Sequence, residues 1–345
     1  MKSSGGENTA YLSIGDSIFS KIKTPEEYIK YLKTTIPASD PLIIKTDWVG
    51  MTEGNPRNFE ALRSIAEATG GKIIVTEGHL LWRKRYLDPD GVTFTVDGKE
   101  RNWDWLLKGR GWTWLIKQKA DWSFFTEGPH WNQIKKEETL WLENHGFTDF
   151  FNEYDIDYIN ATDEIWSGNI VDPKIVKKAV ESKYPAACTE KLYGFMPKKL
   201  YEYRGSTLIS LSKRKNYQSY TMKNNFGLIP DPVRAWWHGY KDKTPDGVSG
   251  KRKNKSILDI NKVYGAFFNM FGIFEAPQGD TSKYRRDVGV SSSMVQLDAI
   301  LNRLCGFNPE EATYLEKGNG LFGSFNDEML DQAEIQLKGW FPVKE

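Results

Sequence analysis

Five basic side chains lie between residues 213 and 234, in a stretch that also contains amides and two prolines. Lysine and arginine form charge-assisted hydrogen bonds with carboxylates and phosphates, and arginine forms them in pairs. Glycine and proline in the same stretch favour a loop of fixed shape. The pattern predicts a site for a small anion, and the alternative is a solvated basic loop whose aromatic residues pack on a sheet. The candidate residues are Lys213, Arg214, Lys215, Asn216, Lys223, Asn224, Asn225 and Arg234.

Two of the four histidines are candidates for hydrogen bonding or proton transfer. His238 follows two tryptophans and has no second histidine or cysteine at metal-ligand spacing, so a metal site is not predicted there. His79 has a companion carboxylate in Glu77, two residues before it. A structural role is the alternative for both histidines, and the sequence assigns no cofactor.

Asp298 lies on the apolar face of a helix expected within Ser292 to Phe307. A buried carboxylate without a partner is costly, so Asp298 is expected to pair with a lysine or arginine or to cap a site. It is therefore a better candidate than a surface acid. The residues expected to point inward from this helix are Val295, Leu297, Ile300, Leu301 and Leu304.

The elements that position these groups begin with a short apolar strand at 42–44, a helix that ends at a glycine pair, and a second strand in KIIVTEGH. This order is typical of a right-handed βαβ unit with parallel strands. Ligands of such sheets lie beyond the carboxyl ends of the strands. The rule indicates Lys45, Asp47, Glu77 and His79 as site residues.

Further patterns predict a single α/β domain over 1–345, with a mostly parallel or mixed central sheet flanked by helices. A helix and a strand are expected within 146–166, a helix within 170–184, and a strand at 207–211. The basic segment 241–255 contains glycine and proline and is expected to be a flexible loop. The segment after it is expected to supply a helix and another strand.

Residues 81–146 contain eight of the thirteen tryptophans and have no regular hydrophobic period. This segment is interpreted as a Trp-rich insertion or lid on the sheet. Aromatic side chains at this density favour a stacking surface for a flat ligand or an interface with a partner. The alternative is a small satellite core that fastens the insertion to the main domain.

Composition limits the classes of function. The 345 residues have a formal net charge of +1 and no apolar run long enough for a membrane helix, so neither a nucleic acid nor a membrane is expected as a partner. The N-terminus has no secretory pattern, which predicts a cytoplasmic protein. Two distant cysteines exclude a disulfide framework and are expected to be buried free thiols. Phosphate-loop, dinucleotide-binding and GxSxG motifs are absent from the sequence.

Three blocks of the sequence resemble the domain-of-unknown-function family numbered 362. LIIKTDW resembles the early strand of that family, SKRKNYQSYTMKNNFGLIPDP its central block, and SSSMVQLDAILNRLCGFNPEEATYL its late block. The blocks occur in the family's order and extend over most of the chain. The central lysine, asparagine and glycine correspond to Lys223, Asn224 and Gly227, and the late aspartate corresponds to Asp298.

The chain departs from the family pattern at two site positions. Asn216 stands where the central block has histidine, and Asp47 stands where the first block has asparagine. With two cysteines, the chain cannot carry the ferredoxin-like cluster module that some members have. The resemblance implies a single α/β domain with one site built from the three blocks, and it implies no particular reaction.

These observations lead to two hypotheses of function. The first is an enzyme for a small carboxylate- or phosphate-bearing substrate, and the second is a non-catalytic ligand-binding or homo-oligomer-forming protein that uses the Trp-rich insertion as an interface. The predicted catalytic residues are Lys223, Asp298, Lys45 and Asp47. The predicted substrate-binding residues are Lys213, Lys215, Asn216, Asn224, Arg234, His238, Glu77 and His79.

Overall fold

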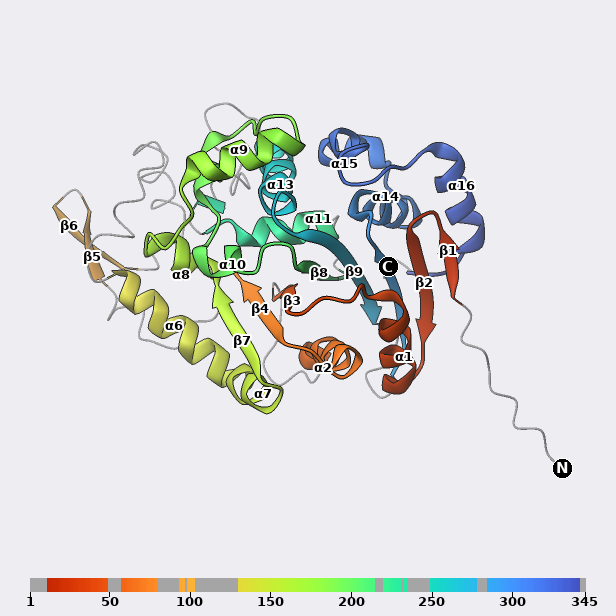
Figure 1. Cartoon of the computed structure of the whole chain (residues 1–345), viewed down its shortest axis with the longest axis horizontal. Helices are drawn as coiled ribbons and strands as arrows, with labels where there is room; N and C mark the ends of the chain where they lie inside the picture. The colour runs from red at the N-terminus through yellow and green to blue at the C-terminus, as the bar shows by residue number, and fades with distance from the viewer. Residues whose placement is uncertain are drawn as a thin grey trace.

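The computed structural model describes residues 11–48, 57–79, 93–96, 98–102, 130–214, 220–230, 233–234, 249–277 and 284–341. Within these ranges an 8-stranded sheet has the strand order β1-β2-β10-β9-β8-β3-β4-β7 (Figure 1). The prediction of an α/β fold with a mixed central sheet is confirmed. The strands are β1 Leu12–Ile14, β2 Ser17–Ile22, β3 Leu42–Lys45, β4 Ile73–Glu77, β7 Ile156–Asn160, β8 Thr207–Lys213, β9 Asn269–Pro277 and β10 Arg286–Ser291.

Five consecutive strands, from the edge strand β7 through β4, β3 and β8 to β9, run parallel to one another. The predicted βαβ unit is present as β3, α2 (Arg57–Thr69) and β4, with Leu42 opposite Ile73. From β3 the chain adds β4 and β7 on one side, and it then crosses back to add β8 and β9 on the other side. The strand order therefore reverses between β3 and β8, and such a reversal is where open α/β sheets bind ligands.

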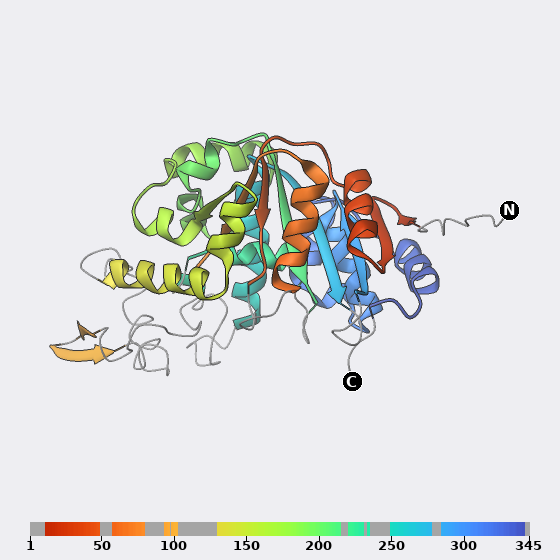
Figure 2. The same ribbon diagram turned by 90° about the horizontal axis from the view of Figure 1, so that it is seen from below.

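Helices cover both faces of the sheet, and the residues of β3 divide between the two layers. Ile44 packs with α1 (Pro25–Thr35), α2 and α7 (Phe147–Glu153). Ile43 packs with α9 (Pro173–Lys183), α13 (Ser249–Gly265) and α14 (Met294–Leu304). Figure 2 shows α1 and α2 side by side on one face of the sheet. Because both faces are covered, the central strands read as apolar runs and not as an alternating pattern.

Further helices and 3-10 turns complete the described part of the fold. They are α6 His130–Asn144, α8 Ala161–Trp166, α10 Lys198–Tyr201, α11 Thr221–Asn224, α15 Thr313–Gly318 and α16 Asp327–Gln336, with 3-10 turns η2 Glu190–Gly194, η3 Asn225–Leu228 and η4 Pro309–Glu311. The flexible loop expected over 241–255 is wrong from Ser249 onward, where α13 begins. Lysine and arginine are good helix formers, and buried residues such as Ile257 and Ile260 anchor the helix to the core. The part of that loop before Ser249 lies outside the described residues.

Part of the Trp-rich insertion is described. Strands β5 (Thr93–Val96) and β6 (Lys99–Asn102) form a separate two-stranded hairpin (Figure 1). Trp141 on α6 is buried, and its ring centroid lies 5.1 Å from that of Trp48 and 5.4 Å from that of Phe147. At this end of the segment, aromatic packing fastens the insertion to the main core. Residues 80–92, 97 and 103–129, with Trp112 and Trp114 among them, lie outside the described residues.

The structure also bears on two expectations from composition. Both cysteines are free, but Cys188 is exposed and Cys305 is half-buried, so the expectation of buried thiols is wrong. Cys188 lies in the connection between α9 and η2, and Cys305 directly follows the last residue of α14. Among the described helices, none is long and apolar enough to cross a membrane.

Candidate functional site at the reversal of strand order

Lys45 is the last residue of β3, and its side chain is only 2% exposed. Its ammonium nitrogen lies 2.6 Å from the carbonyl oxygen of Thr46, 3.0 Å from Oδ1 of Asn224 and 2.9 Å from Oε1 of Glu77. Burial lowers the pKa of Lys45, and the nearby carboxylates of Glu77 and Asp47 oppose that shift. An ammonium group has three N–H donors, so these three acceptors use all of its hydrogen-bonding capacity.

Asn224 fills the place where β3 and β8 end their pairing. The last paired residues of these strands are Lys45 and Ser210. The Asn224 side-chain amide donates to the carbonyl oxygens of Lys45 (3.2 Å) and Leu211 (3.1 Å) and to Oγ of Ser210 (3.1 Å). Asn224 comes from the last turn of α11 and therefore links that helix to the ends of both strands.

The chain that follows α11 approaches the Lys45–Glu77 ion pair closely. A β-carbon at Gly227 would lie 2.8 Å from Nζ of Lys45 and 3.0 Å from Oε1 of Glu77. A β-carbon at Gly78 would lie 2.2 Å from the carbonyl oxygen of Gly227. Gly78 therefore requires glycine because of the close approach of two backbone segments, and a larger residue at Gly227 would displace the side chains of the ion pair.

His79 follows β4 and forms a second polar pair. Its Nδ1 lies 2.5 Å from Oε2 of Glu138 on α6, and the hydroxyl of Tyr158 donates to the other oxygen of Glu138 at 2.9 Å. Arg234 connects this pair to the loop after α11, because it donates to the carbonyl oxygens of His79 (2.7 Å) and Gly227 (3.0 Å). An imidazole that a carboxylate orients in this way has the arrangement of a general acid or base.

Asp47 and Lys213 lie at the carboxyl ends of β3 and β8. The backbone N–H of Lys213 donates to Oδ2 of Asp47 at 3.4 Å. Burial lowers the pKa of Lys213, and the carboxylates of Glu275 and Asp47 oppose that shift. Glu275 in turn accepts from Nη1 of Arg286 at 2.8 Å. The polar residues therefore continue along the sheet edge from β3 and β8 to β9 and β10.

Asp298 is fully buried on α14 and lies at the N-terminal end of α11. It accepts hydrogen bonds from the backbone N–H groups of Thr221 and Met222, both at 2.9 Å, and from the hydroxyl of Thr221 at 2.6 Å. Burial raises the pKa of Asp298 to about 7, and these hydrogen bonds oppose the shift. The carboxylate of Asp298 thus caps the N-terminus of α11, the helix that presents Asn224.

The structure brings many of the predicted residues together. Lys45, Asp47, Glu77, His79, Lys213, Asn224 and Arg234 gather at the carboxyl ends of β3, β4 and β8. Lys223 is half-buried on α11, directly before Asn224, and Asp298 lies at the N-terminal end of that helix. Lys215, Asn216 and His238 lie outside the described residues. Glu138, Glu275 and Arg286 join the site by long-range contacts, and no local sequence pattern indicated them.

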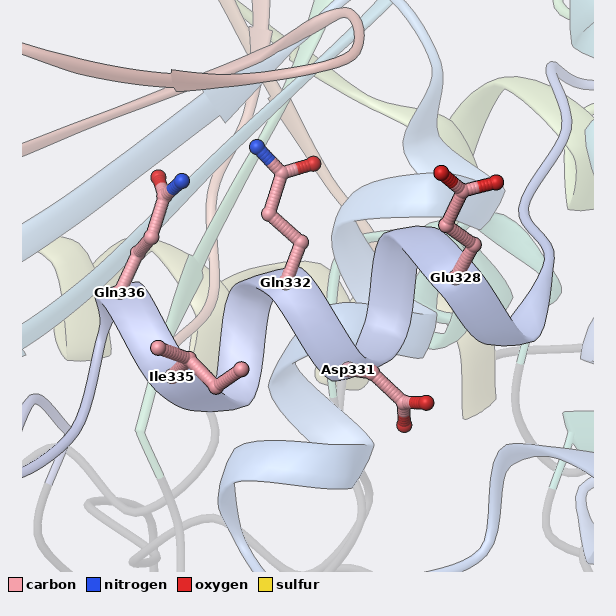
Figure 3. Close-up of a pocket in the computed structure, with 5 residues that line it drawn as sticks. All are labelled: Glu328, Asp331, Gln332, Ile335 and Gln336. Atoms are coloured by element: carbon pink, nitrogen blue, oxygen red, sulfur yellow. The ribbon is translucent and has the colours of Figure 1, made fainter.

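Two further observations concern ligands. Within the described ranges, no three His, Cys, Asp or Glu side chains converge so that they could hold a metal ion. A shallow hollow lies on the outer face of α16, and none of the predicted site residues lines it (Figure 3). The residues that line it are Glu328, Asp331, Gln332, Ile335 and Gln336.

Comparison with known proteins adds no relative to this picture. No family model, no curated protein and no solved structure matches the chain.

Proposed function

We propose that this chain is an enzyme that acts on a small carboxylate- or phosphate-bearing molecule. Its site lies where the strand order reverses between β3 and β8, and the chain is a divergent member of the domain-of-unknown-function family numbered 362. The main support is the concentration of buried ionisable side chains at the carboxyl ends of β3, β4 and β8. Burying charges costs free energy, and perturbed charges gathered at such a position are typical of functional sites.

In this proposal the lysines have different roles. Lys45 is buried and its ammonium group already has three acceptors, so it fixes the ends of β3 and β4 and does not hold the ligand. Lys213 and Lys223 are half-buried, so an anion reaches them without breaking the Lys45 ion pair. Lysine contributes a flexible point charge, which suits either a carboxylate or a phosphate.

The acid–base group of the proposed enzyme is His79. Glu138 holds Nδ1 of its ring at 2.5 Å, so proton transfer with a substrate would use Nε2, an atom that is buried in this structure and that the substrate reaches only if the covering side chains move. Asp47 accepts from the backbone N–H of Lys213, and its carboxylate favours the charged form of both Lys45 and Lys213. Together these groups would hold an anionic substrate and move a proton at an adjacent atom.

The test is ligand binding by calorimetry with inorganic phosphate and a set of mono- and dicarboxylic acids. We expect at least one of these anions to bind, and Lys213→Ala and Lys223→Ala each to weaken binding by about tenfold or more, because each removes a charge-assisted hydrogen bond. The exposed Lys174 is the matched control, and Lys174→Ala should leave affinity unchanged. If both site variants bind as tightly as the wild type, the proposed anion site is wrong.

A further inference from the structure

The short helix α11 depends on its surroundings for its position. It contains 4 residues, and the residue before it, Tyr220, forms no side-chain hydrogen bond at its N-terminus. A helix of this length has almost no stability of its own, because nucleation costs more than one turn of hydrogen bonds returns. Asp298 supplies the missing acceptors for Thr221 and Met222, and Asn224 at the other end contacts the strand ends.

Two other contacts hold the backbone of α11, and both are neutral. The hydroxyl of Ser210 donates to the carbonyl oxygen of Thr221 at 2.6 Å, and the amide of Asn261 donates to that of Met222 at 2.9 Å. Neither group ionises in the ordinary pH range. Of the three contacts to the helix backbone, the one through Asp298 is therefore the one that responds to pH, whereas the ionisable Lys45 contacts α11 through the side chain of Asn224.

The two tyrosines that face Asp298 are also neutral near pH 7. Tyr220 precedes α11 and Tyr314 lies in α15, and burial raises the pKa of both phenols well above their ordinary value. Cys305, just after α14, contacts Tyr220. Asn302, on α14 itself, donates to the backbone carbonyl of Asp298 and carries no charge. Protonation of Asp298 is thus the charge change available on this side of α11.

We propose that Asp298 is a positioning residue, whose ionisation fixes α11 and through it the hydrogen bonds of Asn224 at the ends of β3 and β8. The ionised carboxylate accepts from both backbone N–H groups and from the hydroxyl of Thr221. The protonated acid carries an O–H donor of its own and loses acceptor capacity, so the contact with Thr221 rearranges. Because α11 is short, this rearrangement shifts Asn224 at its other end and alters the geometry of its hydrogen bonds to the strand ends.

This inference rests on the proposed function only for its consequence, which is that the affinity of the anion site depends on pH. A solution experiment on the protein itself tests it. The side-chain amide signals of Asn224 are followed by NMR in the deuterated, 15N-labelled chain, from about pH 5.5 to about pH 8.5, a range that brackets the titration of Asp298. We expect a sigmoidal shift with a midpoint near the Asp298 pKa of about 7. The side-chain amide of Asn269, which donates to Gly205 on the molecular surface, is the control and should not move.

Two variants sharpen the test. Asp298→Asn is neutral at every pH, so its Asn224 signals should be pH-independent and should lie near the acidic limit of the wild type. Thr221→Val removes one hydrogen bond that favours the charged carboxyl, so the midpoint should rise. The Thr221→Val variant also tests the proposal if Asp298→Asn does not fold.

The proposal is overturned if the Asn224 signals stay constant while the backbone amides of Thr221 and Met222 titrate, or if none of these signals titrates. A midpoint in Thr221→Val equal to that of the wild type also overturns it. No ligand is needed, so a failure of anion binding with the coupling present contradicts the proposed function and leaves this inference standing.

Discussion

Replacing Asn224 with alanine tests whether this side chain holds the ends of β3 and β8 together. The substitution removes two N–H donors, which three acceptors share, and one hydrogen bond accepted from the ammonium of Lys45, at a residue that is 7% exposed. The two neutral donors contribute roughly 1 kcal/mol each and the charged bond about 2 kcal/mol, and water entering the vacated space restores part of that sum. We therefore expect Asn224→Ala to lower the free energy of unfolding by roughly 2 to 4 kcal/mol.

Urea denaturation followed by circular dichroism measures this change. The matched control is Asn269→Ala, which loses one exposed hydrogen bond to the carbonyl oxygen of Gly205 and should cost less than about 1 kcal/mol. Asn224→Asp adds a second comparison. It keeps an acceptor for Lys45 but places an oxygen against the carbonyl groups of Lys45 and Leu211, so it should not restore stability. If Asn224→Ala and Asn269→Ala were equally stable, the side chain would not be joining the strands.

Three further predictions concern the same site. Gly78→Ala should destabilise the fold by about 1 to 3 kcal/mol or more, because its β-carbon would lie 2.2 Å from a backbone oxygen. In the control, Gly194→Ala, the added β-carbon meets only an ordinary 3.8 Å contact. Thermal unfolding compares the two variants, and equal midpoints would contradict the close approach at Gly78. Lys45→Met should lower the free energy of unfolding by roughly 3 to 5 kcal/mol, because the buried carboxyl of Glu77 loses its partner. Adding Glu77→Gln should recover part of that free energy in urea unfolding. If the effects of the two substitutions simply add, the ion pair is refuted. Burial raises the pKa of Asp298 from 3.8 to about 7, so its contribution to stability is fully present below pH 3.8 and is lost as the pH rises through about 7. Asp298→Asn should therefore flatten this part of the plot of unfolding free energy against pH. An unchanged slope would refute the assignment.

The βαβ unit and its site residues could be predicted because their signals are local. An apolar run ends at Lys45, another ends at Glu77, and a glycine stop separates them. Parallel pairing then places both residues at one edge of the sheet, as the register of β3 and β4 shows. The ligand-site rule for α/β sheets needs no more information than this.

Strand β10 could not be predicted in the same way. Its sequence, RDVGVS, contains two charges and a glycine, which reads as a loop. Gly289 is required because a β-carbon there would lie 2.8 Å from the ring of Phe19 on β2, and this contact comes from a residue far away in the sequence. Arg286 at its start was missed for the same reason.

Glu138 also depends on a distant contact. It lies on α6 beside another acidic residue, Glu137, and its place in the sequence gives no sign of a partner. Only the packing of α6 against β7 brings it to His79 and Tyr158. Sequence reasoning paired His79 with Glu77, but Glu77 bonds to Lys45.

The charges along the sheet edge indicate from which side a ligand would approach. Asp47 favours the charged form of both Lys45 and Lys213. Lys45 has three acceptors of its own, and Glu275, a carboxylate that favours the charged form of Lys213, is held by Arg286. In the proposed function, an anion can therefore approach Lys213 without unpairing Lys45 or Glu275. We infer that the ligand binds near the carboxyl end of β8, and that Lys45 and Asn224 keep the strand ends in place while it does so.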